Sequence, residues 1–425
     1  MKKRIIAAIC LVAMLVSMTT LGALQSSAAS VWIDKEIPKD LNYSFAVLGD
    51  IQSLTFFDTH QGTTYLADMF DWILDNKEER KIEYIFGLGD TVDTLTTYPN
   101  SARNPREWIK ARSQINRLYD SEGNAIIPFT IVRGNHDDEK GYHKHICTEN
   151  YQNQIDGFFY DPEKPLTLGN SMSNSYRKIQ IGGHKYLMLG LDYHADDSVI
   201  EWANQVISEN PDYKVIVSIH AYLNSSGMFE YEDIGSSNVD DTELVWKPFR
   251  GQNLWNKIFR QHENVFMVLS GHVAVNTPVV NTRTGLNGNE VIEILVDPQG
   301  IDERLHADGK AGAFVLMLNI TNGGEKLEIE YYSTAYGQFY GGGNQRVITL
   351  PEGTLPDFEL PLETTTATTE AAITTELTTA AETTTAQTTV APPTRGCSAA
   401  ISTTAVACSI GTSLAVFAMR RRKED

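Results

Sequence analysis

The stretch VFMVLSGHVAVN (265–276) sets an apolar run directly before a histidine. The run VFMVLS (265–270) is typical of a strand buried on both faces, so His272 falls where that strand ends. An alanine stands two residues further on, at position 274. A histidine in this place either caps the strand end through backbone hydrogen bonds or binds a metal ion. The rest of the sequence has to decide between the two.

The body of the chain alternates strand and helix patterns. Apolar runs that predict buried strands lie at 43–49, 83–89, 127–132, 186–191, 214–219 and 265–270. Two segments, 63–80 and 198–210, place their apolar residues on one helical face. Further on, residues 313–321 and 326–334 predict an antiparallel pair of strands. This alternation predicts an α/β fold.

Several of the predicted strands end at a residue that can bind a metal ion. These residues are Asp50, Asp90, Asn135 with the adjoining His136, His220 and His272. Functional groups collect where the strands of α/β sheets end. A single aspartate or asparagine would be an ordinary turn or cap residue, but the recurrence of carboxylate, amide and imidazole groups is hard to explain by capping. The mixture predicts a site for Mn, Fe or Zn.

The order of these motifs resembles that of the calcineurin-like metallophosphoesterases. The matching stretches are GDIQ (49–52), GDTVD (89–93), GNHD (134–137), the histidine of SIHAY (218–222) and GHVA (271–274). The family signature is D-x-H, GD-x-x-D, GNH-D/E, a lone His and GH-x-H. The resemblance extends over the body, residues 40–350. It implies a four-layer α/β/β/α sandwich of two mixed sheets flanked by helices.

The resemblance implies two metal ions that share the carboxylate of Asp90. Asn135, His220 and His272 would complete one of the two sites, so the opening histidine is interpreted as a ligand. The other site would take Asp50.

That second site lacks the two histidines of the signature, because their positions hold Gln52 and Ala274. A glutamine oxygen binds metal more weakly than an imidazole, and a methyl group does not bind it. His143, His145 or His194 would compensate from other loops, or these three are ordinary surface histidines.

The family mechanism assigns His136 as the general acid that protonates the leaving oxygen. We expect Asp137 to orient that imidazole and Asp93 to brace the loop of Asp90, with plain loop capping as the alternative for both aspartates. Arg133 would reach a phosphate oxygen or pair with a carboxylate. Tyr222 would line the pocket or simply pack. The polar insertion 227–252 is a candidate pocket wall or a surface excursion.

The two ends of the chain predict export and anchoring. Residues 1–29 combine a basic start, an apolar run and small residues, as in a secretory signal peptide. Residues 355–396 are a Thr-rich, low-complexity stalk that cannot bury a core. Residues 398–419 are uncharged and long enough to form a transmembrane anchor, and 420–425 form a basic cytoplasmic tail. The pattern suggests a Gram-positive bacterial membrane protein with its body outside the cell.

The net charge of −19 excludes a protein that coats nucleic acid, because such proteins need a basic stripe. The sequence therefore predicts a membrane-anchored, metal-dependent phosphoesterase whose substrate is a phosphorylated small molecule or envelope component. One metal ion would bind firmly and a second weakly. The alternative is a surface binding or display protein that kept the fold and lost the catalytic activity. Gln52 and Ala274, in place of two histidines, support this alternative.

Overall fold

The structure is a computed structural model that describes residues 32–93, 104–162, 172–193, 195–230, 250–301, 312–341 and 346–355. The predicted signal peptide (1–29), membrane anchor (398–419) and basic tail (420–425) lie outside these residues, as does all of the stalk after residue 355. Within the described part of the chain, no helix is long and apolar enough to span a bilayer.

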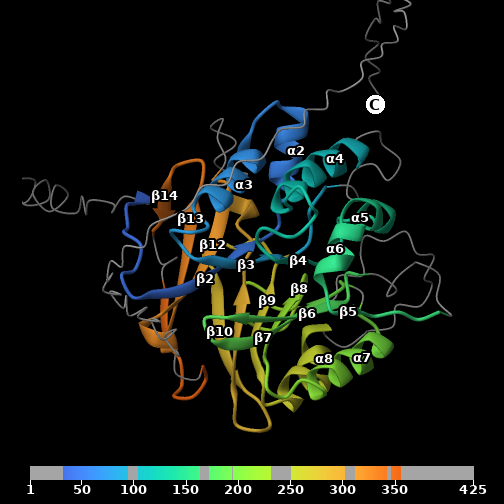
Figure 1. Cartoon of the computed structure of the whole chain (residues 1–425), viewed down its shortest axis with the longest axis vertical. Helices are drawn as coiled ribbons and strands as arrows, with labels where there is room; N and C mark the ends of the chain where they lie inside the picture. The colour runs from blue at the N-terminus through green and yellow to red at the C-terminus, as the bar shows by residue number, and fades with distance from the viewer. Residues whose placement is uncertain are drawn as a thin grey trace, which may run out of the picture. The chain divides into compact units, whose positions relative to one another are not determined.

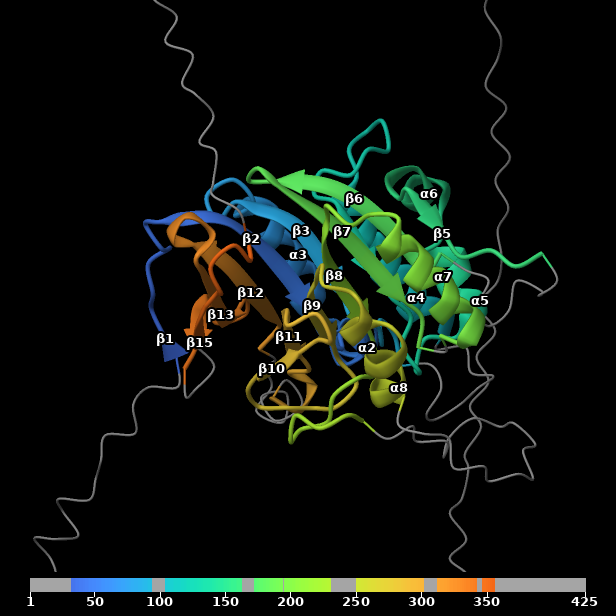
Figure 2. The ribbon, with the colours of Figure 1, turned by 90° about the horizontal axis from the view of Figure 1, so that it is seen from below.

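The first sheet combines strands from both ends of the described chain. Its order is β1 (Trp32–Ile33), β14 (Gln338–Tyr340), β13 (Lys326–Ser333), β12 (Phe314–Thr321), β2 (Leu41–Leu48), β3 (Ile82–Gly87) and β4 (Phe129–Ile131), with β15 (Arg346–Thr349) paired to β13. β2, β3 and β4 are parallel. β12 runs antiparallel to β13, as predicted, and also to β2, so blue and orange strands lie side by side in Figure 2.

The second sheet has the order β10 (Val279–Thr284), β11 (Glu290–Leu295), β9 (Val265–Ser270), β8 (Lys214–Ile219), β7 (His184–Leu191), β6 (Ser175–Ile181) and β5 (Gly157–Phe158). Its central strands β11, β9, β8 and β7 are parallel. β10 and β6 add antiparallel strands on either side. The strand predicted at 265–270 is confirmed as β9.

Helices cover the outer faces of the two sheets (Figure 1). The first sheet carries α2 (Gln52–His60), α3 (Tyr65–Asp75), α4 (Asn104–Ile115), α5 (Glu139–His145) and α6 (Glu149–Gln154), and the second carries α7 (Asp197–Ser208) and α8 (Arg250–Lys257). Short 3-10 turns lie at Asn116–Leu118, Phe259–Gln261 and Asn322–Gly324. The expected four-layer α/β/β/α sandwich of two mixed sheets is confirmed.

The layer between the sheets is apolar because alternate side chains of each strand point into it. On β2, Tyr43, Phe45 and Val47 face this layer, whereas Ala46 and Leu48 face the helices. The ring of Phe45 lies edge-on to Phe86 of β3, at 5.9 Å between ring centroids, and to Tyr186 of β7, at 5.7 Å. Packing between the sheets therefore fixes how the ends of their strands face each other.

We predict that Phe45→Ala lowers the free energy of unfolding by about 3–5 kcal/mol, because it leaves a cavity between the sheets. The Phe45 side chain is 0% exposed. Chemical denaturation of the purified chain measures the change. The matched control is Leu286→Ala, which truncates a side chain that is 60% exposed and should change stability by less than about 0.5 kcal/mol. Equal losses in the two variants would contradict the packing described.

Candidate metal centre

The predicted ligands gather where parallel strands of the two sheets end. Asp90 follows β3 and Asn135 follows β4 in the first sheet, whereas His220 follows β8 and His272 follows β9 in the second. Because parallel strands end at the same edge of a sheet, the turns after them lie together. The site therefore lies between the sheets and takes ligands from both.

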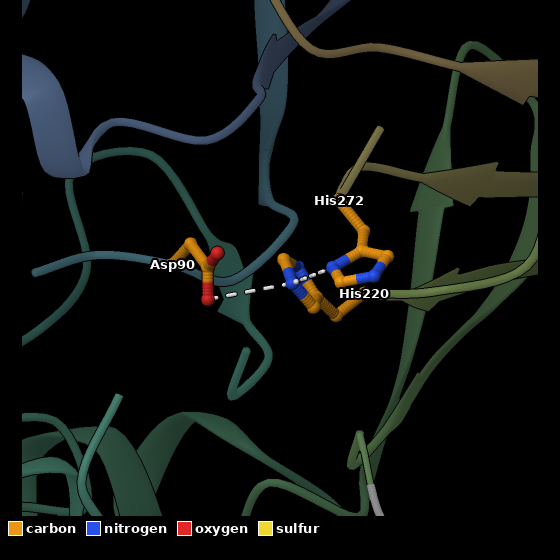
Figure 3. A group of neighbouring side chains, drawn as sticks. All are labelled: Asp90, His220 and His272. Atoms are coloured by element: carbon orange, nitrogen blue, oxygen red, sulfur yellow. Dashed lines mark hydrogen bonds and ion pairs between the residues drawn. The ribbon is translucent and has the colours of Figure 1, made fainter. Parts of the chain in front are cut away.

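Four side-chain atoms converge at this point: Asp90 Oδ1, Asn135 Oδ1, His220 Nε2 and His272 Nδ1. Nε2 of His220 lies 3.2 Å from Nδ1 of His272 and 3.3 Å from the Asp90 oxygen (Figure 3). It also lies 2.8 Å from the Asn135 oxygen. Nδ1 of His272 lies 3.0 Å from the Asn135 oxygen. Ligands about 2.0–2.2 Å from one ion are themselves about 3.0–3.5 Å apart, so the spacing is that of a coordination shell.

The hydrogen bonding of His220 shows that a cation fits this site. Its Nδ1 lies 2.8 Å from the carbonyl oxygen of Leu88, and a carbonyl only accepts, so Nδ1 carries the proton. In the neutral ring Nε2 is then a lone pair, yet it faces the Asn135 oxygen, another acceptor, at 2.8 Å. Two acceptors at this distance need a proton or a metal ion between them. Fixing the tautomer through the second nitrogen is typical of metal-binding histidines.

The charges of Asp90 and His220 support each other inside the protein. Burial alone raises the pKa of Asp90, but the neighbouring His220, with His136, outweighs it and holds the pKa below the ordinary value. Burial likewise lowers the pKa of His220, and the Asp90 carboxylate outweighs it, so the pKa rises. The site thus favours an anionic carboxylate beside a positive charge.

The backbone is strained at two of the ligands. Asp90 has a φ of 47° and His272 a φ of 76°, the left-handed region that non-glycine residues seldom adopt. Such conformations persist where the surrounding structure imposes them, most often at functional sites. Gly134 contributes by close approach, because a Cβ there would lie 2.2 Å from Asp90 Oδ1.

His136 borders the metal ligands with its ring half-buried. Its backbone N–H donates to Asp90 Oδ1 at 2.8 Å, and Nε2 of its ring lies 3.9 Å from Asp90 Oδ2. Nδ1 lies 2.9 Å from the carboxylate of Asp93. Burial lowers the pKa of His136, but the Asp93 hydrogen bond and the Asp90 charge reverse the effect and raise it.

Asp93 and Asp137 each have the role that the sequence analysis expected of the other. Asp93 contacts the His136 ring, whereas the buried Asp137 accepts hydrogen bonds from the backbone N–H groups of Val92 and Gly134, each at 3.0 Å. Asp137 therefore braces the loops that carry Asp90 and Asn135. Its carboxylate is directed at the backbone donors of these loops. Burial, with the charge of Asp90, raises the pKa of Asp137 to about 7.

Asp50 and Gln52 each contact one of the turns that carry the ligands. Both oxygens of Asp50 accept from the backbone N–H of His272, at 3.0 and 3.1 Å. Nε2 of Gln52 donates to Asp90 Oδ2 at 3.2 Å. Ala274, in the position of the missing histidine, is exposed.

A further carboxylate, Asp297, lies beside Asp50 and was not predicted. Burial, followed by Asp297 and Asp90, raises the pKa of Asp50 well above its ordinary value. Burial raises the pKa of Asp297 itself to about 7. The sequence held the signal, because the apolar run VIEILV (291–296) of β11 ends directly before Asp297.

Two residues whose roles the sequence left open lie outside the metal centre. The guanidinium of Arg133 makes two hydrogen bonds, of 2.9 and 2.8 Å, to the buried carboxylate of Asp192, so it pairs with a carboxylate. Tyr222 is fully buried, and its hydroxyl donates to Glu293 at 2.5 Å, so it packs.

The candidate replacement histidines and the candidate pocket wall add nothing to the site. His143 and His145 belong to α5, where His143 lies 3.9 Å from Glu139. His145 is buried against Trp108, so it is not a surface residue. His194 and residues 231–249 of the insertion lie outside the described residues.

Tyr193 is a wall of the site that sequence reasoning missed. It follows β7, and its ring centroid lies 5.7 Å from that of His220 and 6.1 Å from that of His272. No local pattern marks it, because its place depends on how β7 lies beside β8 in the sheet.

The comparisons with known proteins agree with this geometry. Residues 43–276 match the calcineurin-like phosphoesterase family. The match covers more than half of the chain and spans every ligand of the site described, from Asp50 to His272. The chain therefore belongs to the calcineurin-like phosphoesterase family, as its motifs indicated.

Two similar proteins add context. The uncharacterized protein YvnB of Bacillus subtilis (strain 168) is 27% identical over 259 residues, which are 58% of this chain and 17% of YvnB. The chain thus matches only a small part of that relative. Among solved structures, GAP50, the anchor in the inner membrane complex of Plasmodium, is similar at 12% identity and a TM-score of 0.40, covering 74% of this chain and 91% of GAP50. A score at this level carries no argument about function.

We predict that Gly134→Ala abolishes tight metal binding, because its Cβ would collide with Asp90 Oδ1 at 2.2 Å and displace that ligand. Elemental analysis of the purified protein measures the bound metal. The control Gly288→Ala also introduces a Cβ at a positive φ, of 81°, but meets no atom within 4 Å. It should lose only about 1 kcal/mol of stability and keep its metal. Equal metal content in the two variants would contradict the arrangement around Asp90.

Proposed function

We propose that this chain is a metal-dependent hydrolase of phosphomonoesters or phosphodiesters. Membership of the calcineurin-like phosphoesterase family supports the reaction class. The observation that carries the proposal is the pair of acceptors, His220 Nε2 and Asn135 Oδ1, held 2.8 Å apart inside the protein. A metal ion between these two atoms, in place of a proton on Nε2, satisfies both of them.

Each residue then has a defined part. Asp90, Asn135, His220 and His272 hold the cation, with Asp50 and Gln52 beside them. When bound, such an ion supplies positive charge to the phosphoryl oxygens and acidifies water. His136 is the proton donor to the leaving oxygen through Nε2, because Asp93 holds its Nδ1. Asp137 keeps the loops of the site in place through the backbone of Val92 and Gly134.

The substrate is proposed to lie outside the cytoplasm. The basic and apolar residues of 1–29 and the uncharged segment 398–419 support export and a membrane anchor. Residues 420–425 support a cytoplasmic end, as in a Gram-positive cell membrane protein. A phosphorylated envelope component or extracellular small molecule is then within reach of the folded body.

We predict that the chain cleaves a generic aryl phosphomonoester or diester in the presence of Mn²⁺. His136→Ala should lower kcat about 10²–10⁴-fold, as the loss of a general acid does, and leave the metal content unchanged. The matched control is His143→Ala, which removes another half-buried histidine, from α5, and should leave kcat unchanged. A wild-type chain that is loaded with metal and cleaves neither ester would support the display protein in place of the enzyme.

We further predict that Asp93→Asn lowers kcat about 10–100-fold with little change in metal content, because it loosens the His136 ring. Asp137→Asn should instead weaken metal binding, since it replaces one of the two oxygens that accept from Val92 and Gly134 by an NH2 group, which cannot accept. Steady-state kinetics and elemental analysis of the two variants separate these effects. Identical behaviour of the pair would contradict the division of roles.

A further inference from the structure

The loop of residues 90–93 is hydrogen-bonded at every residue to a side chain outside it. The side chains that contact its first three residues are those of Gln52, Thr55 and Asp137. The fourth residue, Asp93, is the one whose carboxylate contacts the ring of His136. Whatever holds Asp93 in place therefore also fixes the direction of the proposed proton donor.

The side chain that holds Asp93 is that of Glu107, in the first turn of α4. Its Oε2 accepts from the backbone N–H of Asp93 at 3.0 Å, and its Oε1 lies 3.1 Å from Nε2 of His60, the last residue of α2. The helices α2 and α4 pack side by side over the first sheet (Figure 1). Glu107 thus connects both helices to the loop that ends at Asp93.

The burial of the Glu107 carboxylate is unfavourable in itself. The residue is 0% exposed, and among the described residues it has no lysine or arginine partner. Burial raises the pKa of Glu107, and the hydrogen bonds with Asp93 and His60 offset only part of that rise. A glutamate in a first helical turn is stabilised by the N-terminus of its own helix. Both oxygens of Glu107 instead contact other segments, so these contacts account for its position.

The next residue of α4, Trp108, contacts the segment that carries His136. Its indole N–H donates to Oδ2 of Asp138 at 2.7 Å, and the residue is 1% exposed. Asp138 ends the motif GNHDD (134–138), in which His136 is the third residue. Adjacent residues of one helix therefore contact both segments of the pair formed by Asp93 and His136.

We infer that Glu107 is a positioning residue for the proton donor, because it holds Asp93 by the backbone and Asp93 in turn holds the His136 ring. The inference rests on the proposed function. A proton donor acts only within hydrogen-bond reach of the leaving oxygen. Without Glu107 the N–H of Asp93 loses its acceptor, and the end of the loop is free to shift. Asp90 keeps its own contacts, since none of them involves Glu107.

The loss of a positioned proton donor depends on the leaving group. Protonation matters most when the leaving oxygen is strongly basic, as in an alkyl ester, and least when it departs as a stabilised anion such as 4-nitrophenolate. A displaced metal ion slows the cleavage of both esters, because the ion acts on the phosphoryl group itself. The ratio of the two rates therefore separates a misplaced donor from general damage to the site.

The test measures kcat of the full chain with Mn²⁺ on an alkyl and a 4-nitrophenyl ester of phosphate. Glu107→Leu removes the acceptor and should lower kcat for the alkyl ester about 10–100-fold more than for the aryl ester. Glu107→Gln should keep both rates near those of the wild type, because an amide oxygen still accepts from the N–H of Asp93. Glu107→Ala decides in the same way if Glu107→Leu does not fold.

The matched control is Asp58→Leu. Asp58 is another buried carboxylate between α2 and α4, 7% exposed, but it accepts from the backbone N–H of Leu66 in α3, at 3.0 Å. Its loss should destabilise the chain and leave the ratio of the two rates at the wild-type value. A Glu107→Leu variant with the wild-type ratio overturns the inference, and so does an equal change of the ratio in Asp58→Leu.

A second measurement separates the failure of this inference from the failure of the proposed function. The Asp93 carboxylate only accepts, so Nδ1 of His136 carries a proton. Its proton resonance, assigned by its absence in His136→Ala, should exchange slowly with water in the wild type and in Glu107→Gln, and rapidly in Glu107→Leu. A chain that shows this difference and cleaves neither ester keeps the positioning role and loses the function. A chain that cleaves both esters without this difference keeps the function and loses the positioning role.

Discussion

The hydrogen bond from His220 Nδ1 to the carbonyl oxygen of Leu88, 2.8 Å long, determines the chemistry of the whole centre. It fixes the tautomer of a fully buried imidazole and leaves Nε2 as an acceptor that faces the Asn135 oxygen. Leu88 belongs to the turn after β3 and His220 to the turn after β8, so this one contact links the two sheets at the site. A proton or a metal ion has to lie between His220 Nε2 and the Asn135 oxygen.

The fold makes this contact possible at the expense of backbone strain in two turns. The apolar layer between the sheets sets their distance, and the parallel strands bring their last residues to one edge. The turns then bend sharply enough to place Asp90 and His272 at positive φ. Strain of about 1–3 kcal/mol at each such residue is tolerated because the packed strands that precede both turns hold them in place.

Most of the architecture could be predicted from the sequence. The buried strands read as continuous apolar runs, and the ligands Asp90, Asn135, His220 and His272 stood at their ends. That two sheets bring these ends together was implied by the family resemblance. The edges of the sheets were harder, because strands such as β6 alternate between buried and exposed residues and do not stand out as apolar runs.

The rest of the site depends on contacts between turns, which a sequence pattern does not encode. Asp93 and Asp137 are equally plausible partners of His136 by spacing, and only the direction of each carboxylate decides between them. Tyr193 reaches the histidines through strand packing. Asp297 is different, because it follows the end of a strand as Asp90, His220 and His272 do. The family signature has no residue at this position, so the resemblance does not single it out.

The most direct measurement is X-ray absorption at the metal edge of the protein loaded with one equivalent of Zn²⁺. The account predicts a first shell of mixed nitrogen and oxygen atoms with the outer-shell scattering of two imidazoles, those of His220 and His272. A shell of oxygen atoms alone, with no imidazole scattering, would contradict the claim that these histidines and Asn135 surround a common ion.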